Sequence, residues 1–228
     1  MIDFSLSEEQ QLIVDTVRDF AAGEIHPAAR KCEEKEEPIP DALVQGAWQL
    51  GLILNTIPES FGGGGEPRSA VTGALITEEL AKGDLALALH LLSPNLAVLP
   101  VLEFGSDAQK AAHLPRYAGE KFAAGSVAIV EPSMHYGPLD LATTATKKGA
   151  NYVLKGKKCF VPVLDDTAPI LVFAKEGDAV QGFFVERNAG GMKIEPEKNM
   201  GLNALNLCEI AFEECAVPAS ARLGEAGT

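Results

Sequence analysis

The chain has 228 residues, of which 46% are hydrophobic and 6% aromatic, and its formal net charge is −13. This length is enough for one large or two small buried cores. The high density of negative charge, without a continuous basic stripe, argues against binding to nucleic acid. No apolar run is long enough to cross a bilayer, so we expect a cytoplasmic protein that does not insert into membranes.

The cysteines and histidines give no sign of a metal site. Zinc sites use paired soft ligands at short spacing, and this chain has no C-x-x-C motif and no clustered histidines. The sequence therefore predicts no bound metal and reduced, mostly buried thiols. The cysteines concerned are Cys32, Cys159, Cys208 and Cys215.

The N-terminal part has the pattern of amphipathic helices. Ser7 and Gln10 have the spacing of a capping box, and apolar residues such as Ile13 and Val17 recur behind them at helical intervals. Pro27 predicts a break or kink at the end of this helix. Further helices are expected after Pro40 and from Ser69 to Lys82.

The glycine run from Gly62 to Gly65 invites comparison with phosphate-binding loops. Such a loop requires a Lys-Ser/Thr pair at the start of a helix, and none follows here. We interpret the run as a mobile surface loop.

An apolar stretch from Leu85 to Leu102 follows, and a helix that is hydrophobic on most sides must be buried. His90 lies inside it, and we expect a core histidine whose polar atoms are satisfied. Ser106 or Asp107 then caps a short helix that ends near Tyr117.

After Gly119 the pattern changes to short runs of β-branched and aromatic residues separated by turn residues, which predicts strands. We expect an α+β chain: an all-α domain over residues 1–120, followed by an antiparallel β-barrel or sandwich over residues 121–228. The strand candidates are Val127–Val130, Leu141–Thr146, Tyr152–Leu154, Phe160–Val161, Ile170–Phe173, Phe183–Glu186, Met192–Ile194 and Glu209–Phe212.

Short motifs along the whole chain resemble the acyl-CoA dehydrogenase family of flavoenzymes, in order and in spacing. They are Leu6–Gln10, Trp48–Leu52, Ile57–Glu59 with the glycine run, Gly105–Pro115, Val130–Pro132, Gly156–Lys158, Asn199–Gly201, Phe212–Glu213 and Val217–Pro218.

This resemblance implies a helical domain, a β domain and a C-terminal four-helix domain. It also implies an oxidoreductase of fatty acid metabolism that removes hydrogen from Cα and Cβ of an acyl-CoA, with FAD as the hydride acceptor and an electron-transfer flavoprotein as the usual electron partner. The chain ends at Thr228, where the C-terminal domain of the family would begin. Because the family's general base normally lies in that domain, we expect no catalytic residue here and predict that this chain alone is inactive. A cut chain and a second polypeptide both remain open.

The resemblance places the flavin at two motifs. The first contains Ile129, Val130 and Glu131, and the second contains Phe160, Val161 and Pro162. Val130 stands where the family has a threonine hydroxyl, and Pro162 replaces a second threonine and lacks a backbone N–H. These changes predict FAD that is weakly bound, shared with a partner, or lost.

The resemblance also suggests residues near the substrate. Leu91, Leu92 and Leu96 would line the acyl tunnel, with simple core packing as the alternative. Tyr136 stands where the family has a small serine near cofactor and thioester.

Three functional hypotheses stay open at this point. The first is an acyl-CoA dehydrogenase-like subunit that needs a C-terminal domain or a complementary subunit. The second is a non-catalytic acyl-CoA-binding or scaffold subunit, in which His135 and Tyr136 fill the flavin cavity. The third is new catalysis by Glu131, His135 or Tyr136. Without the C-terminal domain, the first domain should expose apolar surface. We therefore expect this chain to associate with a complementary chain or with a second copy of itself.

Overall fold

The first helix begins at the capping box that the sequence predicts. In the computed structural model, which describes residues 5–35, 37–164 and 168–225, the Gln10 amide N–H donates to Ser7 Oγ at 3.1 Å. The Gln10 side-chain oxygen accepts in return from the Ser7 N–H at 3.1 Å. Helix α1 (Glu8–Phe20) then buries Val14 and Val17 on one face.

Where the sequence predicts a break or a kink at Pro27, the structure has a wider helical turn just before this residue. A π-helical turn, Ala21–Ile25, connects α1 to α2 (His26–Glu34), and the His26 N–H donates to the carbonyl of Ala21, five residues back. Pro27 therefore lies in the first turn of α2, where a missing N–H costs little. The looser π-turn gives the chain room for the ring without ending the helix.

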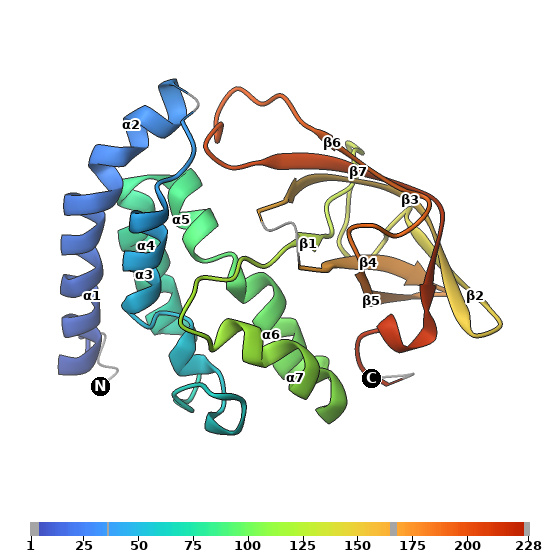
Figure 1. Ribbon diagram of the computed structural model, residues 1–228, viewed down its shortest axis with the longest axis horizontal. Coiled ribbons are helices and arrows are strands. Elements are labelled where there is room, and N and C mark those ends of the chain that lie inside the picture. Colours follow the sequence, from blue (N-terminus) through green and yellow to red (C-terminus); the bar gives the residue numbers. More distant parts are fainter. Residues whose placement is uncertain (1–4, 36, 165–167, 226–228) are drawn as a thin grey trace. The chain divides into compact units, whose positions relative to one another are not determined.

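Further helices complete the first compact unit, which comprises residues 1–92, 120–122 and 199–205. Helix α4 packs against α1 and α5, and α3 contacts α5 (Figure 1). Their bounds are α3 Asp41–Gln49, α4 Ala70–Gly83 and α5 Leu85–Leu91.

The glycine run forms a tight turn against two short 3₁₀ segments, Leu54–Thr56 and Glu59–Phe61. The N–H groups of residues 62–66 all donate to carbonyls of residues 54–59. A Cβ on Gly63 would lie 2.0 Å from the carbonyl oxygen of Ile57, so only glycine fits there. Because its N–H groups are used internally, this loop has none of them to offer to a phosphate.

His90 corrects one expectation. Its ring stacks on Phe122 at 5.4 Å, and Phe122 meets the edge of Trp48 at 5.6 Å. The residue as a whole is half-buried, and its Nδ1 atom is buried without a hydrogen-bond partner in the structure. His90 is therefore neither fully buried in the core nor satisfied at both ring nitrogens. Burial lowers the pKa of His90 to about 4.

The second compact unit comprises residues 93–119, 123–198 and 206–228. It contains α6 (Pro94–Phe104), α7 (Asp107–His113) and a 3₁₀ turn, Leu114–Tyr117. At the start of α7, Ser106 forms a second capping box with Gln109. The sequence predicted that either Ser106 or Asp107 caps this helix, and the structure shows that Ser106 does.

A seven-stranded sheet forms the rest of this unit in the described ranges, with strand order β1-β4-β2-β3-β7-β6 and β5 paired to β4. The pairs β2–β3, β3–β7, β6–β7 and β4–β5 are antiparallel, whereas β4 runs parallel to β1 and β2. The α+β prediction is confirmed, and the sheet is mixed rather than wholly antiparallel. The strands are β1 Val127–Ala128, β2 Thr144–Lys148, β3 Asn151–Pro162, β4 Ile170–Glu176, β5 Ala179–Val185, β6 Met192–Pro196 and β7 Leu207–Pro218.

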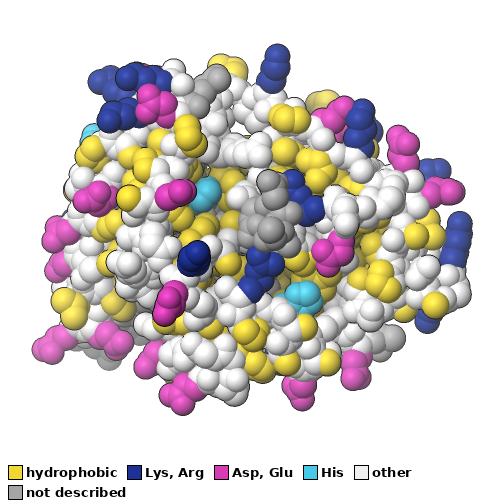
Figure 2. Space-filling view, in the orientation of Figure 1, with side chains coloured by type: hydrophobic (Ala, Val, Ile, Leu, Met, Phe, Trp, Pro, Cys, Tyr) yellow, Lys and Arg dark blue, Asp and Glu magenta, His cyan; other side chains and the backbone are white. Residues whose placement is uncertain are grey.

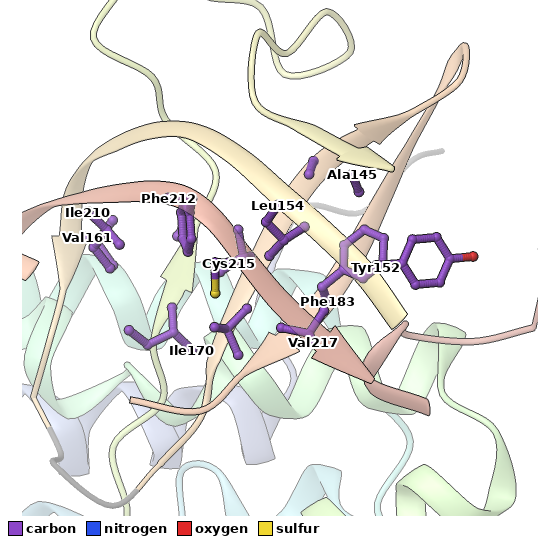
Figure 3. Packing of buried hydrophobic residues seen from close by; sticks show 14 of the residues in the cluster. Ala145, Tyr152, Leu154, Val161, Ile170, Phe183, Ile210, Phe212, Cys215 and Val217 are labelled. Atoms are coloured by element: carbon purple, nitrogen blue, oxygen red, sulfur yellow. The ribbon is translucent and has the colours of Figure 1, made fainter. Parts of the chain in front are cut away.

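The core of the second unit lies on the inner face of this sheet (Figure 3). Phe183, Leu154 and Ile210 are fully buried there, and the hydroxyl of Tyr152 points away from the cluster to the Glu176 carboxylate at 2.8 Å. The four cysteines are buried and free.

The boundary predicted near residue 120 stays a prediction, because the two units follow spatial contacts and group residues 93–119 with the sheet. Within the described residues no single helix is long and apolar enough to cross a membrane. The neighbouring helices α5 and α6 would pass that test only as a bent pair, by length and composition.

Candidate functional site

The site is built around the carboxylate of Glu131, which follows β1. Glu131 is buried, and both of its oxygens accept hydrogen bonds. Oε2 accepts from the Ala142 N–H at 2.6 Å, and Oε1 accepts from the Thr143 N–H at 2.8 Å and from Lys158 Nζ at 2.8 Å. These contacts join the segment after β1 to the start of β2 and to β3.

Lys158 is the matching buried cation, with 0% of its side chain exposed. Its ammonium also donates to the carbonyl oxygen of Ile129 at 3.1 Å, and the N–H of Cys159 donates to the carbonyl of Val130 at 3.0 Å. The ion pair and the two carbonyl contacts therefore hold the two predicted flavin motifs side by side.

The electrostatics of the pair follow from burial and contact. Burial by itself would raise the pKa of Glu131, but the hydrogen bonds from Lys158, Thr143 and Ala142 outweigh it and lower that pKa below its usual value. Burial lowers the pKa of Lys158 while Glu131 opposes the shift. We treat the pair as ionised at neutral pH, because two backbone N–H groups and an ammonium all donate to the carboxylate.

Phe160 is the unusual residue of the second motif. Its φ is +52°, and the register between β3 and β7 shifts between Lys158 and Val161, which marks a β-bulge. A bulky residue in this left-handed region is a backbone outlier, of the kind that often marks a functional site. The Phe160 side chain is 52% exposed, whereas its neighbours Cys159 and Val161 are buried.

The rest of the first motif is a turn. The Tyr136 N–H donates to the carbonyl of Ser133, and Gly137 bridges to Asp140. Tyr136 is half-buried, and burial together with the charge of Glu131 raises the pKa of its hydroxyl. Met134 in this turn is fully exposed. Elsewhere on the surface, Figure 2 shows that hydrophobic side chains are exposed between charged ones on the face in view.

The other sequence-predicted residues fall in different surroundings. Leu91 is buried in α5, Leu92 follows it half-buried, and Leu96 is half-buried in α6 of the second unit. His135 is exposed, and its N–H donates to Ser133 Oγ at 3.2 Å. The roles predicted for these residues stay predictions.

Comparison with known proteins decides the family. Residues 7–121 match the N-terminal domain of acyl-CoA dehydrogenase, and residues 126–215 match its middle domain. The chain belongs to the acyl-CoA dehydrogenase family. The site described above therefore lies in the middle domain of this family.

Three relatives show the extent of the likeness. Cyclohex-1-ene-1-carbonyl-CoA dehydrogenase of Geobacter metallireducens is 33% identical over 98% of this chain and 60% of its own length. The structure of a glutaryl-coenzyme A dehydrogenase glutaryl-CoA complex has a TM-score of 0.85 and 27% identity, over 99% of this chain and 59% of that one. A chain in a structure described as the electron transferring flavoprotein of Acidaminococcus fermentans has a TM-score of 0.81 and 28% identity, over 98% and 60%. The chain thus spans about 60% of the length of these relatives.

The residues of the site fit a flavin ring in part. Phe160 presents an exposed aromatic face, and the segment from Ile129 to Glu131 is held firmly beside it. Val130 and Pro162 carry no hydroxyl for the polar edge of the ring, and Val161 is turned into the sheet core. The aromatic ring and the main chain of the site are therefore compatible with FAD, whereas Val130 and Pro162 offer no side-chain hydrogen bond to it.

Sequence reasoning missed Lys158 and Glu197 as members of the site. Lys158 lies in a motif that carried the family resemblance, and a lysine in a strand is usually exposed. Glu197 Oε2 accepts the N–H of Phe160 at 2.5 Å, across 37 residues of sequence. Nothing in the local pattern around Glu197 signals this contact.

Proposed function

We propose that this chain is part of an acyl-CoA dehydrogenase, in which its middle domain holds FAD and an acyl-CoA thioester undergoes α,β-dehydrogenation. The observation that supports this most is the buried pair Glu131–Lys158, which holds two separate segments of the chain next to the exposed ring of Phe160. A site held this firmly keeps its geometry while ligands enter and leave.

Six residues would hold the cofactor in this proposal. Phe160 would stack on the flavin ring, and the segments on either side of the buried pair would contribute their main chain. When bound, FAD supplies the hydride acceptor for the β-hydrogen of the substrate. The six residues are Ile129, Val130, Glu131, Phe160, Val161 and Pro162.

The substrate residues proposed are Tyr136 near the thioester and three leucines along the acyl chain. Tyr136 would exclude water and narrow the site, because it is much larger than a serine. Apolar leucines orient an acyl chain by removing it from water. The leucines are Leu91, Leu92 and Leu96.

The proton at the α-carbon requires a base that we do not assign to this chain. Both oxygens of Glu131 are already used by three donors, which makes it a poor proton acceptor. We propose that a C-terminal family domain or a complementary subunit supplies the base. An electron-transfer flavoprotein is the proposed electron acceptor.

A titration of purified protein with FAD tests this proposal. We expect a change in flavin absorbance and fluorescence with this chain, and dehydrogenation of acyl-CoA only when a complementary family subunit is added. Absence of any flavin signal, alone and with that subunit, would contradict the proposal.

A second candidate is a non-catalytic subunit that binds acyl-CoA without FAD. The missing hydroxyls at Val130 and Pro162 and the half-buried Tyr136 favour it, since each lost buried hydrogen bond weakens binding by about 1–3 kcal/mol. Binding of acyl-CoA in calorimetry without any FAD binding would select this candidate.

A further inference from the structure

The bulge in β3 leaves one backbone donor outside the sheet ladder. Lys158 pairs with Ile210 and Val161 pairs with Cys208, so Cys159 and Phe160 lie opposite the single residue of β7 between those partners. The N–H of Phe160 instead donates to Glu197 Oε2 at 2.5 Å. A side chain thus replaces the hydrogen bond that the neighbouring strand would otherwise provide.

Glu197 is itself fixed in place by the sheet. It directly follows β6, whose last residue Pro196 pairs with Cys208, and its own N–H donates to the carbonyl of Leu207 at 2.9 Å. Its main chain cannot shift without breaking these ladder contacts. Its carboxylate therefore reaches the bulge from a rigid position.

The conformation of Phe160 needs such a partner. For a residue with a Cβ, the left-handed region is sterically unfavourable, because the Cβ approaches the following carbonyl oxygen. This cost is offset here by contacts on both sides of the residue: Cys159 is tied to Val130, and the Phe160 N–H is tied to Glu197. The result is that the aromatic ring points outward between two buried neighbours.

We propose that Glu197 is a positioning residue, which holds Phe160 in its left-handed conformation and thereby presents the aromatic ring to the flavin. The part of this inference that concerns flavin rests on the proposed function. The part that concerns the backbone of Phe160 does not.

Amide hydrogen exchange measures the backbone part without any cofactor. In Glu197→Ala the Phe160 amide should exchange about five- to tenfold faster, as expected for one lost hydrogen bond. Glu197→Gln retains an acceptor oxygen and should restore most of the protection. Glu195→Ala is the matched control, because Glu195 lies on β6 in an exposed ion pair with Lys193 and should leave Phe160 unchanged.

Flavin binding measures the second part through a double-mutant cycle. Glu197→Ala should weaken FAD binding about five- to tenfold and reduce the visible circular dichroism of the bound flavin, and Phe160→Leu should have the same effects. The double variant should bind like Phe160→Leu alone, because Glu197 acts only through that ring. Additive losses in the double variant would overturn the positioning role.

The two measurements separate the two ideas. Unchanged exchange at Phe160 in Glu197→Ala overturns the inference, whatever happens with flavin. Failure of the wild-type chain to bind FAD, alone or with a complementary subunit, overturns the proposed function and the flavin part of the inference. In that case the exchange data still decide whether Glu197 holds the bulge.

Discussion

Two buried carboxylates differ in the cations that neutralise them: Glu79 in the first compact unit and Glu131 in the second. Both side chains are about equally buried. Glu79 accepts two hydrogen bonds from Arg18, at 3.0 and 3.1 Å, and one from Lys82 at 2.9 Å, and both cations are more than half exposed. The partner of Glu131, Lys158, is completely buried.

This difference determines what the loss of a partner does. If Arg18 is removed, Lys82 remains and water reaches the carboxylate from the side of the lost cation. If Lys158 is removed, neither another cation nor water replaces it, and a charge stays buried without its counterion. Glu79 and Glu131 are therefore equally buried but not equally dependent on one partner. Glu79 can lose a cation and keep another, whereas Glu131 depends on Lys158 alone.

The largest effect should come from Lys158→Met, which leaves the Glu131 carboxylate buried with two backbone donors. We expect the free energy of unfolding in urea to fall by about 3–5 kcal/mol. The double variant Lys158→Met with Glu131→Gln should recover a large part of that loss, since no charge is then buried. If the free energy of unfolding of Lys158→Met falls by less than about 1 kcal/mol, Glu131 does not depend on its partner more strongly than Glu79 does.

His90 extends the comparison to a half-buried ionisable group whose buried Nδ1 atom has no hydrogen-bond partner. Its folded-state pKa of about 4 lies below its ordinary value of 6.5, so the unfolded chain binds more protons between these two pH values. Stability should therefore decrease as pH falls from 6.5 towards 4, by up to roughly 3 kcal/mol. His90→Phe should flatten this part of the pH profile, and an unchanged profile would contradict the assignment.

Below pH 4.5, the dependence of the unfolding free energy on pH should reflect protonation of the carboxylates themselves. The pKa of Glu131 is lowered in the folded state, so its contribution is fully present above the ordinary value of 4.5 and is lost as pH falls through the folded pKa. In Glu131→Gln the unfolding free energy should depend less steeply on pH below 4.5. A slope equal to that of the wild type would mean that Glu131 is not ionised in the fold.

The smallest effect should come from Arg18→Ala. The hydrogen bond from Arg18 is the main cause of the lowered pKa of Glu79, and Lys82 provides the next contribution. Because Lys82 stays in place, we expect a decrease in melting temperature much smaller than that of Lys158→Met. The measurement is thermal unfolding of both variants at low and high salt, where only Arg18→Ala should approach the wild type as salt rises.

Local chemistry predicted several parts of this protein correctly. The capping box at Ser7 and the helix cap at Ser106 follow from contacts within a few residues. The hydrogen bonds inside the glycine run were not predicted, because the run was expected to be a mobile loop. At Pro27 the sequence predicted a break or a kink, and the structure shows that a π-turn interrupts the α-helix just before this residue.

The sequence by itself determined the α+β class, the helix starts and the two motifs that frame the site, since each depends on residue type and spacing along the chain. Only the tertiary structure decided that Lys158 is buried against Glu131, that β4 also pairs in parallel, and that Glu197 holds Phe160. The physical reason is the same in each case. These contacts join residues that are 27 or more positions apart, and the free energy that favours them comes from burial and hydrogen bonding, which local patterns do not record.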